Sequence, residues 1–454
     1  MRTDDSVRYR EVHLPPPRDP LLIVAQLARS GWFDQYLVYE SDQAWHFAGG
    51  SLACLRLSRD WAVVRQVGGP TRRVPCTGNP LGVVEQFLAT TGIAGWRAYG
   101  WAAFEMAQLL AGAGDQVGDA DLLHLVVPQT EVRITAEGMV LRSTDPQLLD
   151  ALTQSLLDDH SVPDHTADPD VAVDVAVEDS RNYRAAVAAA VLDIRAGLLE
   201  KVIISRVVEV GAAVDLVGSY VAGRRNNTPA RSFLLDLGRM RAAGFSPETV
   251  VVVSPEGRVS TQPLAGTRAR TGSPARDREL CAELLADPKE IYEHAVSVKL
   301  AWDEVAAVCE PDSVGIGEFM AVRERGSVQH LASTVSGRLP VHGRMWTAFA
   351  ALFPAVTATG IPKRPAYELI RRLEGQERGL YAGAVMVCDS EGSLDAALVL
   401  RSIFQEGDRT WLQAGAGIVG QSLPEREHEE TCEKLRSVAR CLVSARTAQS
   451  LPTG

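Results

Sequence analysis

The sequence lacks paired cysteine motifs, long apolar runs and an excess of positive charge. Its seven cysteines are scattered and odd in number, so neither a disulfide framework nor a structural zinc site is expected. No apolar run reaches the length of a membrane span, and no apolar segment of a signal peptide follows the first residues. We therefore expect no membrane partner and a cytoplasmic location. The formal net charge of −11 argues against nucleic acid and against anionic membranes as partners.

Aromatic residues make up only 6% of the 454 residues, while hydrophobic residues make up 46%, as in ordinary globular proteins. Residues 1–20 are polar and proline-rich, which predicts a flexible N-terminal arm. Further along, short strand-like runs mix with long helical patterns without strict alternation, which favours an α+β fold with large antiparallel sheets as the core and helices outside. We expect one domain over residues 21–450, with an N-terminal part (21–178) and a part that carries the motifs (179–445).

Two predicted helices each begin with a pair of glutamates, Glu290 with Glu293 and Glu427 with Glu430. Residues three apart share one face of a helix, and Lys434 follows on the face of Glu430. One such pair alone is also typical of a solvated first turn, where acidic side chains complement the helix dipole. Two pairs aimed at one point would instead form an oxygen-rich site, suited to a magnesium ion shared with an anionic substrate.

Four further residues have two interpretations each. Lys201 opens a β-branched run and is either a strand-end lysine that reaches water or a desolvated general base. Glu248 precedes an apolar strand and is either a sheet-edge charge or a general acid in a dry cleft. Arg401 lies inside an apolar predicted strand, 394–402, and if it faces inward it needs an anion, from the protein or from a substrate carboxylate. His330 fits a buried core histidine better than a catalyst.

Two glycine-containing segments would allow close contact with a ligand. The loop 262–268 is either a simple tight turn or a carboxylate site made by backbone N–H groups and the Thr267 hydroxyl. Gly415 to Gly417 follow a predicted strand that ends at Ala414, and they would permit close approach of the backbone. This second segment lacks the spacing of a dinucleotide-binding fingerprint.

Taken together, the segments resemble the chorismate-utilising enzymes, and most closely the salicylate synthases of siderophore pathways. The similarity is strongest over residues 180–445 and weaker before them. The matching motifs, in chain order, are KVIISR (201–206), NNTPARSFLL (226–235), GFSPE (244–248), PLAGTRA (263–269), KEIYEH (289–294), VRERGSVQHL (322–331), TGIPK (359–363), GLYAGAV (379–385), AGAGI (414–418) and EREHEETCEKL (425–435).

The resemblance implies that the chain binds chorismate and Mg²⁺. Glu293 and Glu430 match direct metal ligands of the family, and Glu290 and Glu427 match carboxylates that hold the metal through water. Lys201 matches the base that activates water for attack at C2 of the ring. Glu248 matches the acid that helps the C4 hydroxyl to leave. The expected substrate-binding residues are Thr267, His330, Thr357, Tyr381, Arg401, Gly415, Ala416, Gly417 and Lys434.

The same resemblance bears on the reaction. Lys201 together with Ala265 implies water as the nucleophile and isochorismate as the first product, and the motif around 322–331 resembles the branch that then releases pyruvate to give salicylate. We therefore expect a salicylate synthase without an obligatory glutaminase subunit, and a monomer. Three alternatives stay open: an isochorismate synthase that releases its product, an anthranilate-type enzyme, and a non-catalytic chorismate-binding protein. Gln262 departs from the family, whose water-using members usually carry glutamate there.

Overall fold

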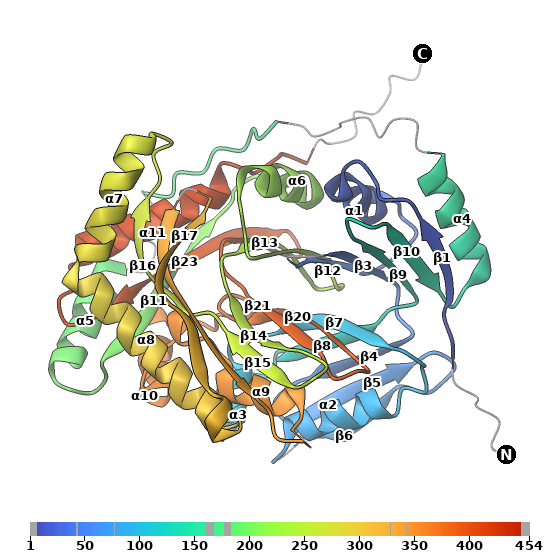
Figure 1. Cartoon of the computed structure of the whole chain (residues 1–454), viewed down its shortest axis with the longest axis horizontal. Coiled ribbons are helices and arrows are strands. Elements are labelled where there is room, and N and C mark those ends of the chain that lie inside the picture. The colour runs from blue at the N-terminus through green and yellow to red at the C-terminus, as the bar shows by residue number, and fades with distance from the viewer. Residues whose placement is uncertain are drawn as a thin grey trace.

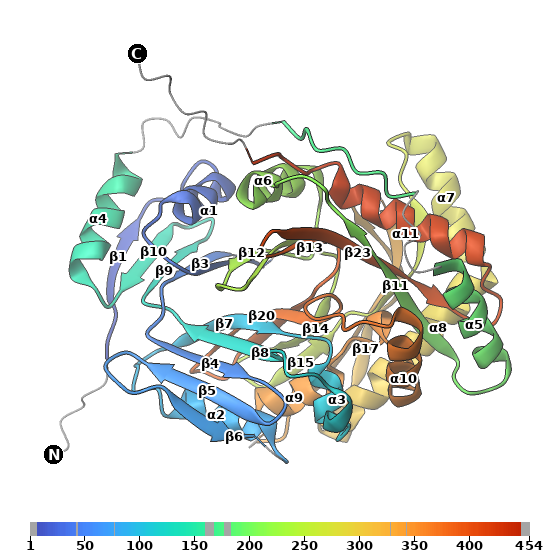
Figure 2. The same cartoon turned by 180° about the vertical axis from the view of Figure 1, so that it is seen from behind.

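The structure of the protein is a computed structural model that describes residues 7–41, 44–76, 78–158, 168–176, 183–326, 328–341 and 343–445. Within these residues, two large antiparallel sheets stack on one another and helices lie around them (Figures 1 and 2). The predicted α+β class, with antiparallel sheets as the core and helices outside, is confirmed.

The first sheet runs through eleven strands of the described chain in the order β1-β10-β9-β3-β2-β12-β13-β22-β23-β11-β19. Its strands, in chain order, are β1 (Arg10–Leu14), β2 (Tyr36–Glu40), β3 (Trp45–Gly49), β9 (Thr130–Ile134), β10 (Met139–Ser143), β11 (Lys201–Glu209), β12 (Arg231–Asp236), β13 (Met240–Ser246), β19 (Gly360–Ile361), β22 (Ser402–Glu406) and β23 (Arg409–Ile418).

The second sheet has the order β16-β18-β15-β14-β21-β20-β7-β8-β4-β5-β6, and β17 pairs with the outer side of β18. Its strands, in chain order, are β4 (Ala53–Leu57), β5 (Trp61–Gln66), β6 (Arg72–Pro75), β7 (Arg97–Ala102), β8 (Leu123–Val127), β14 (Thr249–Val253), β15 (Arg258–Thr261), β16 (Leu264–Ala269), β17 (Gly315–Arg325), β18 (Val328–Arg338), β20 (Ala384–Asp389) and β21 (Leu394–Leu398).

The helices cover the outer faces of the sheets, with α1 and α6 over the first sheet and α2 and α9 outside the second (Figure 1). They are α1 (Pro20–Arg29), α2 (Pro80–Ala89), α3 (Met106–Leu110), α4 (Pro146–Leu157), α5 (Tyr183–Arg195), α6 (Leu216–Asn226), α7 (Pro274–Ala286), α8 (Pro288–Ala306), α9 (Met345–Leu352), α10 (Lys363–Glu374) and α11 (Pro424–Ala439), with short 3₁₀ turns η1 (Gly114–Gln116), η2 (Pro311–Ser313) and η3 (Val356–Ala358).

The core lies mainly between the two sheets, and strand β2 shows how the sequence produces it. Leu37 and Tyr39 point into the core that both sheets share, while Val38 between them packs into a second core beneath α1 and α6. Successive side chains of a strand point to opposite faces, so a continuous apolar run buries both faces of its sheet. The first sheet is therefore covered on both sides along this strand.

The predicted flexible arm over residues 1–20 is wrong for residues 10–14, which form β1 and pair in register with β10. Both sheets also combine strands from the two predicted parts of the chain, for example β2 with β12 and β20 with β7. The predicted boundary near residue 179 lies outside the described residues. No helix in the described ranges has the length and apolar character needed to cross a membrane.

Candidate active site

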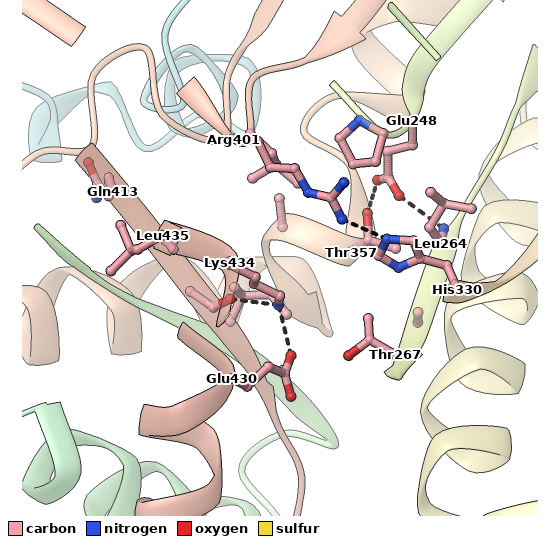
Figure 3. A pocket seen from close by; sticks show the side chains of 18 of the residues that line it. Glu248, Leu264, Thr267, His330, Thr357, Arg401, Gln413, Glu430, Lys434 and Leu435 are labelled. Carbon is pink, nitrogen blue, oxygen red and sulfur yellow. Dashed lines mark hydrogen bonds and ion pairs between the residues drawn. The ribbon is translucent and has the colours of Figure 1, made fainter. Parts of the chain in front are cut away.

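A pocket of about 860 Å³ opens between the two sheets and the helices α8 and α11 (Figure 3). Two groups of side chains stand at its opposite sides. We call the first group the glutamate end; it consists of Glu290, Glu293, Glu427 and Glu430. We call the second group the arginine end; it consists of Glu248, His330, Thr357 and Arg401.

The glutamate end is built by the first turns of α8 and α11. The Asp287 carboxylate accepts hydrogen bonds from the backbone N–H groups of Lys289 at 2.9 Å and of Glu290 at 3.4 Å, which fixes where α8 begins. Glu290 and Glu293 are then one turn apart and each only 7% exposed. The structure thus confirms the predicted helical pairs, and it brings both pairs to one side of the pocket.

Three lysines offset the four carboxylates of the glutamate end. The ammonium of Lys201, which is 1% exposed, lies 2.9 Å from Glu293 Oε1 and also donates to the Ser297 hydroxyl at 3.1 Å. Lys434 lies 2.8 Å from Glu430 Oε1, one helical turn away on α11. Lys289 lies 3.3 Å from Glu427 Oε1. Lysine is seldom fully buried unless it is paired, so each of these contacts helps to keep the charges inside.

The electrostatics of the glutamate end suit a divalent cation. Burial, together with neighbouring carboxylates, raises the pKa of both Glu427 and Glu290. Glu427 Oε2 is buried and accepts no hydrogen bond from the described residues. Against the effect of its burial, Lys434 and Lys289 lower the pKa of Glu430. A set of hard oxygen donors with excess negative charge is what Mg²⁺ prefers, although no three acidic, His or Cys side chains of the described chain converge as ligands in this structure.

Gly415 and Gly417 lie inside β23, so the predicted end of this strand at Ala414 is wrong. The strand continues to Ile418 because these residues pair in register with β11. A Cβ atom on Gly417 would lie 2.2 Å from Glu293 Oε1, and one on Gly415 would lie 3.1 Å from the Tyr381 hydroxyl. The missing side chains therefore let β23 pass directly beside the pocket, while close approach of this backbone to a ligand stays a prediction.

The segment 262–268 is not a simple turn, because residues from Leu264 onward form strand β16 with a bulge at Gly266, where φ is +81°. Its backbone N–H groups hold protein carboxylates. The N–H of Leu264 donates to Glu248 Oε2 at 3.0 Å, and the N–H of Thr267 donates to Glu290 Oε2 at 3.2 Å. One short strand thus orients a carboxylate at each end of the pocket.

At the arginine end, Glu248 sits in the turn between β13 and β14, as the sequence predicts. It is 2% exposed, and the Thr357 hydroxyl donates a hydrogen bond to its Oε1 (Figure 3). Burial raises the pKa of Glu248 to about 7, although the bonds from Thr357 and Leu264 act in the opposite direction. A carboxyl group of this kind holds its proton near neutral pH and can donate it.

The prediction that Arg401 lies inside a strand is wrong, since β21 stops at Leu398 and Arg401 stands in the connection to β22 with a φ of 51°. Its guanidinium bonds to His330 Nε2 at 2.7 Å and donates to the Arg325 carbonyl at 3.0 Å. Burial lowers the pKa of Arg401 to about 10, so it remains a cation. Burial and Arg401 also hold the pKa of His330 low, so the imidazole accepts this bond in its neutral form.

Arg401 makes no ion pair with a carboxylate in the part of the chain that the structure describes. A buried cation without an anion is costly, and a carboxylate that entered the pocket would meet it. Of the two interpretations from the sequence, the structure excludes a protein carboxylate among the described residues. The charge and burial of the arginine end therefore suit an anionic group of a ligand.

Twelve of the predicted site residues line the pocket, which includes Tyr381 and both glycines of β23. Lys201, Ala416 and Glu427 lie just behind its wall. Lys201 reaches the site through Glu293, and Glu427 reaches it through Lys289. Ala416 is fully buried between the two glycines of β23.

Two charged residues of the site were missed from the sequence. Lys289 bridges the two helices, because its ammonium lies 3.3 Å from Glu427 Oε1 and 3.6 Å from Glu290 Oε1. Arg268 on β16 lies 2.5 Å from Asp287 and 3.4 Å from Glu290. Both lie within matched motifs. The position of Lys289 directly before the predicted metal-site acid Glu290 is the signal that would have pointed to it.

Comparison with known proteins shows the family and the fold of the chain. A family described as chorismate binding enzyme matches residues 37–440. A salicylate synthase of Mycolicibacterium paratuberculosis is 43% identical over 95% of this chain and 96% of its own length. Anthranilate synthase component 1 of Haloferax volcanii is 41% identical over 56% of this chain, a match that spans 49% of that protein.

Among solved structures, the menaquinone-specific isochorismate synthase of Escherichia coli has a TM-score of 0.72 and 21% identity, and the match covers 96% of this chain and 95% of that one. Anthranilate synthase component I of Streptococcus pneumoniae has a TM-score of 0.73 and 24% identity, with 87% of this chain and 92% of that chain covered. At these identities the structural matches establish the fold alone.

Proposed function

This chain belongs to the family of chorismate binding enzymes, and on that premise we propose that it is a magnesium-dependent salicylate synthase. In this proposal chorismate is converted to isochorismate by addition of water and loss of a hydroxyl, and isochorismate then yields salicylate and pyruvate in the same pocket. The similarity to a salicylate synthase over nearly the whole of both chains supports this reaction over those of partly matched relatives.

The observation that carries the proposal is a pair of buried ionisable groups, one directly behind the pocket wall at the glutamate end and one lining the arginine end. Lys201 at the glutamate end is 1% exposed, and Glu248 at the arginine end is 2% exposed. Burial raises the pKa of Glu248, which favours a carboxyl group that gives a proton, and Lys201 matches the base of the family. Attack of water and departure of a hydroxyl on one ring need this combination.

The chain's own residues have distinct parts in the proposed reaction. Lys201 takes a proton from the water that attacks C2, and Glu248 gives its proton to the C4 hydroxyl, which leaves as water. The Thr357 hydroxyl and the Leu264 N–H fix both oxygens of Glu248 for this donation. Arg401 and Tyr381 hold the carboxylate of the pyruvyl group, and Lys434 with the β23 backbone borders the ring carboxylate.

Glu293 and Glu430 would hold Mg²⁺ directly, and Glu290 and Glu427 would hold it through water. When bound, the metal would supply positive charge that offsets the ring carboxylate of the substrate. The buried Glu427 Oε2 without a hydrogen bond, and the raised pKa of Glu427 and Glu290, support this assignment. We further propose that the enzyme acts as a cytoplasmic monomer in siderophore biosynthesis, without a glutaminase subunit.

The decisive experiment is to incubate the purified protein with chorismate, with and without Mg²⁺, and to separate the products by chromatography. Equal amounts of salicylate and pyruvate, formed only with metal, are the expected result. Isochorismate alone would move the protein to the isochorismate synthases. Anthranilate formed when ammonium salts are added would favour the ammonia-using alternative. Unchanged chorismate under all conditions would overturn the proposal and favour a binding protein, and Gln262→Glu would then be tested for restored turnover.

A further inference from the structure

A second, narrow cavity is lined in part by Glu248. Glu248 and Thr357 line both the pocket and this cavity, so the two spaces share these side chains. We call the second space the rear cavity. Its other polar side chains are Thr249, Thr261, Gln262 and Glu304.

The rear cavity has the size and chemistry of a water site. Its free space accommodates about one water molecule, and a buried water needs two to four polar partners. Gln262 forms no side-chain hydrogen bond within the described residues, so its amide is free to bind such a water. Thr357 and Glu304 offer further oxygen atoms.

Glu304 connects the rear cavity with the outside of the protein. It lies in the last turns of α8, and its Oε1 is 2.5 Å from the ammonium of Lys363 at the start of α10. Both side chains are partly exposed, 15% for Glu304 and 14% for Lys363. Lys363 also donates to the Leu352 carbonyl at 3.3 Å, which anchors the pair beside the segment that carries Thr357.

From this arrangement we propose that a water molecule in the rear cavity passes protons from Glu304, by way of the Thr357 hydroxyl, to Glu248. The proposal rests on the proposed function, because it assigns the source of the proton that Glu248 gives to the leaving hydroxyl. Substrate fills the front of Glu248 during turnover, so only the rear side stays open to a proton donor. Glu304 thereby becomes a positioning residue that acts through the general acid.

The proton balance closes without any further reactant. After Glu248 has lost its proton to the departing hydroxyl, the Thr357 hydroxyl donates its proton to the carboxylate, the water donates to Thr357, and Glu304 donates to the water. The Lys363 ammonium stabilises the Glu304 carboxylate that remains, until a proton from solvent restores it. Burial raises the pKa of Glu304 and of Glu248 to about 7 in both cases, so transfer between them is nearly balanced.

Glu304→Gln tests the relay, because it keeps the shape and the contact with Lys363 but carries no acidic proton. We expect kcat for salicylate formation to fall about tenfold, less than the loss of a direct general acid, with KM for chorismate unchanged. Asp303→Asn is the matched control: Asp303 is the adjacent residue on α8, more than half exposed, and pairs with Lys299 at the surface. Its activity should equal that of the wild type.

Chemical rescue distinguishes proton transfer by Glu304 from a purely structural role of the Glu304–Lys363 pair. Glu304→Ala opens space at the outer end of the rear cavity, and added formate should restore a large part of kcat in this variant but have no effect on Asp303→Ala. Full kcat in Glu304→Gln, or a slow Glu304→Ala enzyme that formate does not accelerate, would overturn the relay while the wild type still makes salicylate. A wild type without any turnover of chorismate would overturn the proposed function, and the relay with it.

Discussion

The two ends of the pocket differ in the sign of their uncompensated charge. At the glutamate end, four carboxylates face three lysines, and the buried Glu427 Oε2 accepts no bond from the described residues. At the arginine end, the cation Arg401 contacts only a neutral imidazole and a carbonyl, and Glu248 retains its proton near neutral pH. One end therefore attracts a cation and the other an anion.

This difference determines the orientation in which a charged ligand can bind in the pocket. A small ligand with two carboxylates can enter with one of them at Arg401 and the other at a metal beside the glutamates, but the opposite placement leaves charges unpaired. The orientation also fixes which ionisable group meets which ring carbon, since Lys201 stands at one end and Glu248 at the other. Each prediction below removes the charge or the bond that distinguishes one end from the other.

Removal of the metal should have the largest effect. Chelation by EDTA should reduce salicylate formation to background, and added Mg²⁺ should restore it, because the excess carboxylates repel the ring carboxylate when no cation is present. Without substrate, Mg²⁺ should raise the Tm of the wild type, since a ligand that binds only the folded state stabilises it.

The Tm measurement also identifies the metal ligands independently of activity. Glu430→Gln should abolish the increase of Tm with Mg²⁺. Glu429→Gln is the matched control, because Glu429 is the neighbouring residue on α11 and its ion pair with Arg436 lies at the surface. An equal increase of Tm in wild type and Glu430→Gln would contradict the assignment of this end as the metal site.

Lys201→Gln should have the next largest effect. Glutamine keeps a polar side chain at this position but cannot take a proton, so kcat should fall on the order of 10³-fold. The control is Lys299→Gln on α8, which replaces an exposed lysine that pairs with Asp303. Full activity of Lys201→Gln would refute the assignment of Lys201 as the base.

Much of this contrast could be predicted from the sequence, because its signals are local. Glutamates three residues apart on a predicted helix must share a face, and an acid directly after a turn must stand at the end of a strand. The convergence of the helices could not be predicted in this way. It depends on tertiary packing, in which α8 lies against β16 and α11 lies against β23.

The errors have the same origin. Ala397 to Arg401 form a continuous apolar run with a terminal cation, but the strand stops at Leu398 because the chain turns, with Arg401 in the left-handed region. Residues 10–14 form a strand only because β10, far away in the sequence, supplies its partner. Such long-range pairing leaves no local signal, and neither does the rear cavity.

Replacement of Arg401 should weaken substrate binding at the arginine end. Arg401→Met removes a buried cation that would bind a substrate carboxylate, so KM for chorismate should rise by roughly 10- to 100-fold, as expected for a lost hydrogen bond to a charged group. Arg401→Lys keeps the charge but loses the planar guanidinium group, and its KM should lie between those of the wild type and Arg401→Met. Equal KM values in all three proteins would mean that the carboxylate binds elsewhere.

The smallest expected effect is a shift in the pH dependence of kcat/KM. A general acid works in its protonated form, and the protonated fraction of Glu248 falls as pH rises through its pKa of about 7. The basic limb of kcat/KM should therefore lie near pH 7.

The Thr357 hydroxyl bonds to the ionised form of Glu248 and lowers its pKa, so Thr357→Val should move the limb to higher pH by about one unit. The position of the limb is read independently of the plateau, which the loss of the hydroxyl also lowers. A limb that stays in place, or moves to lower pH, would show that another group titrates there, and the arginine end would then lack the proton that distinguishes it from the glutamate end.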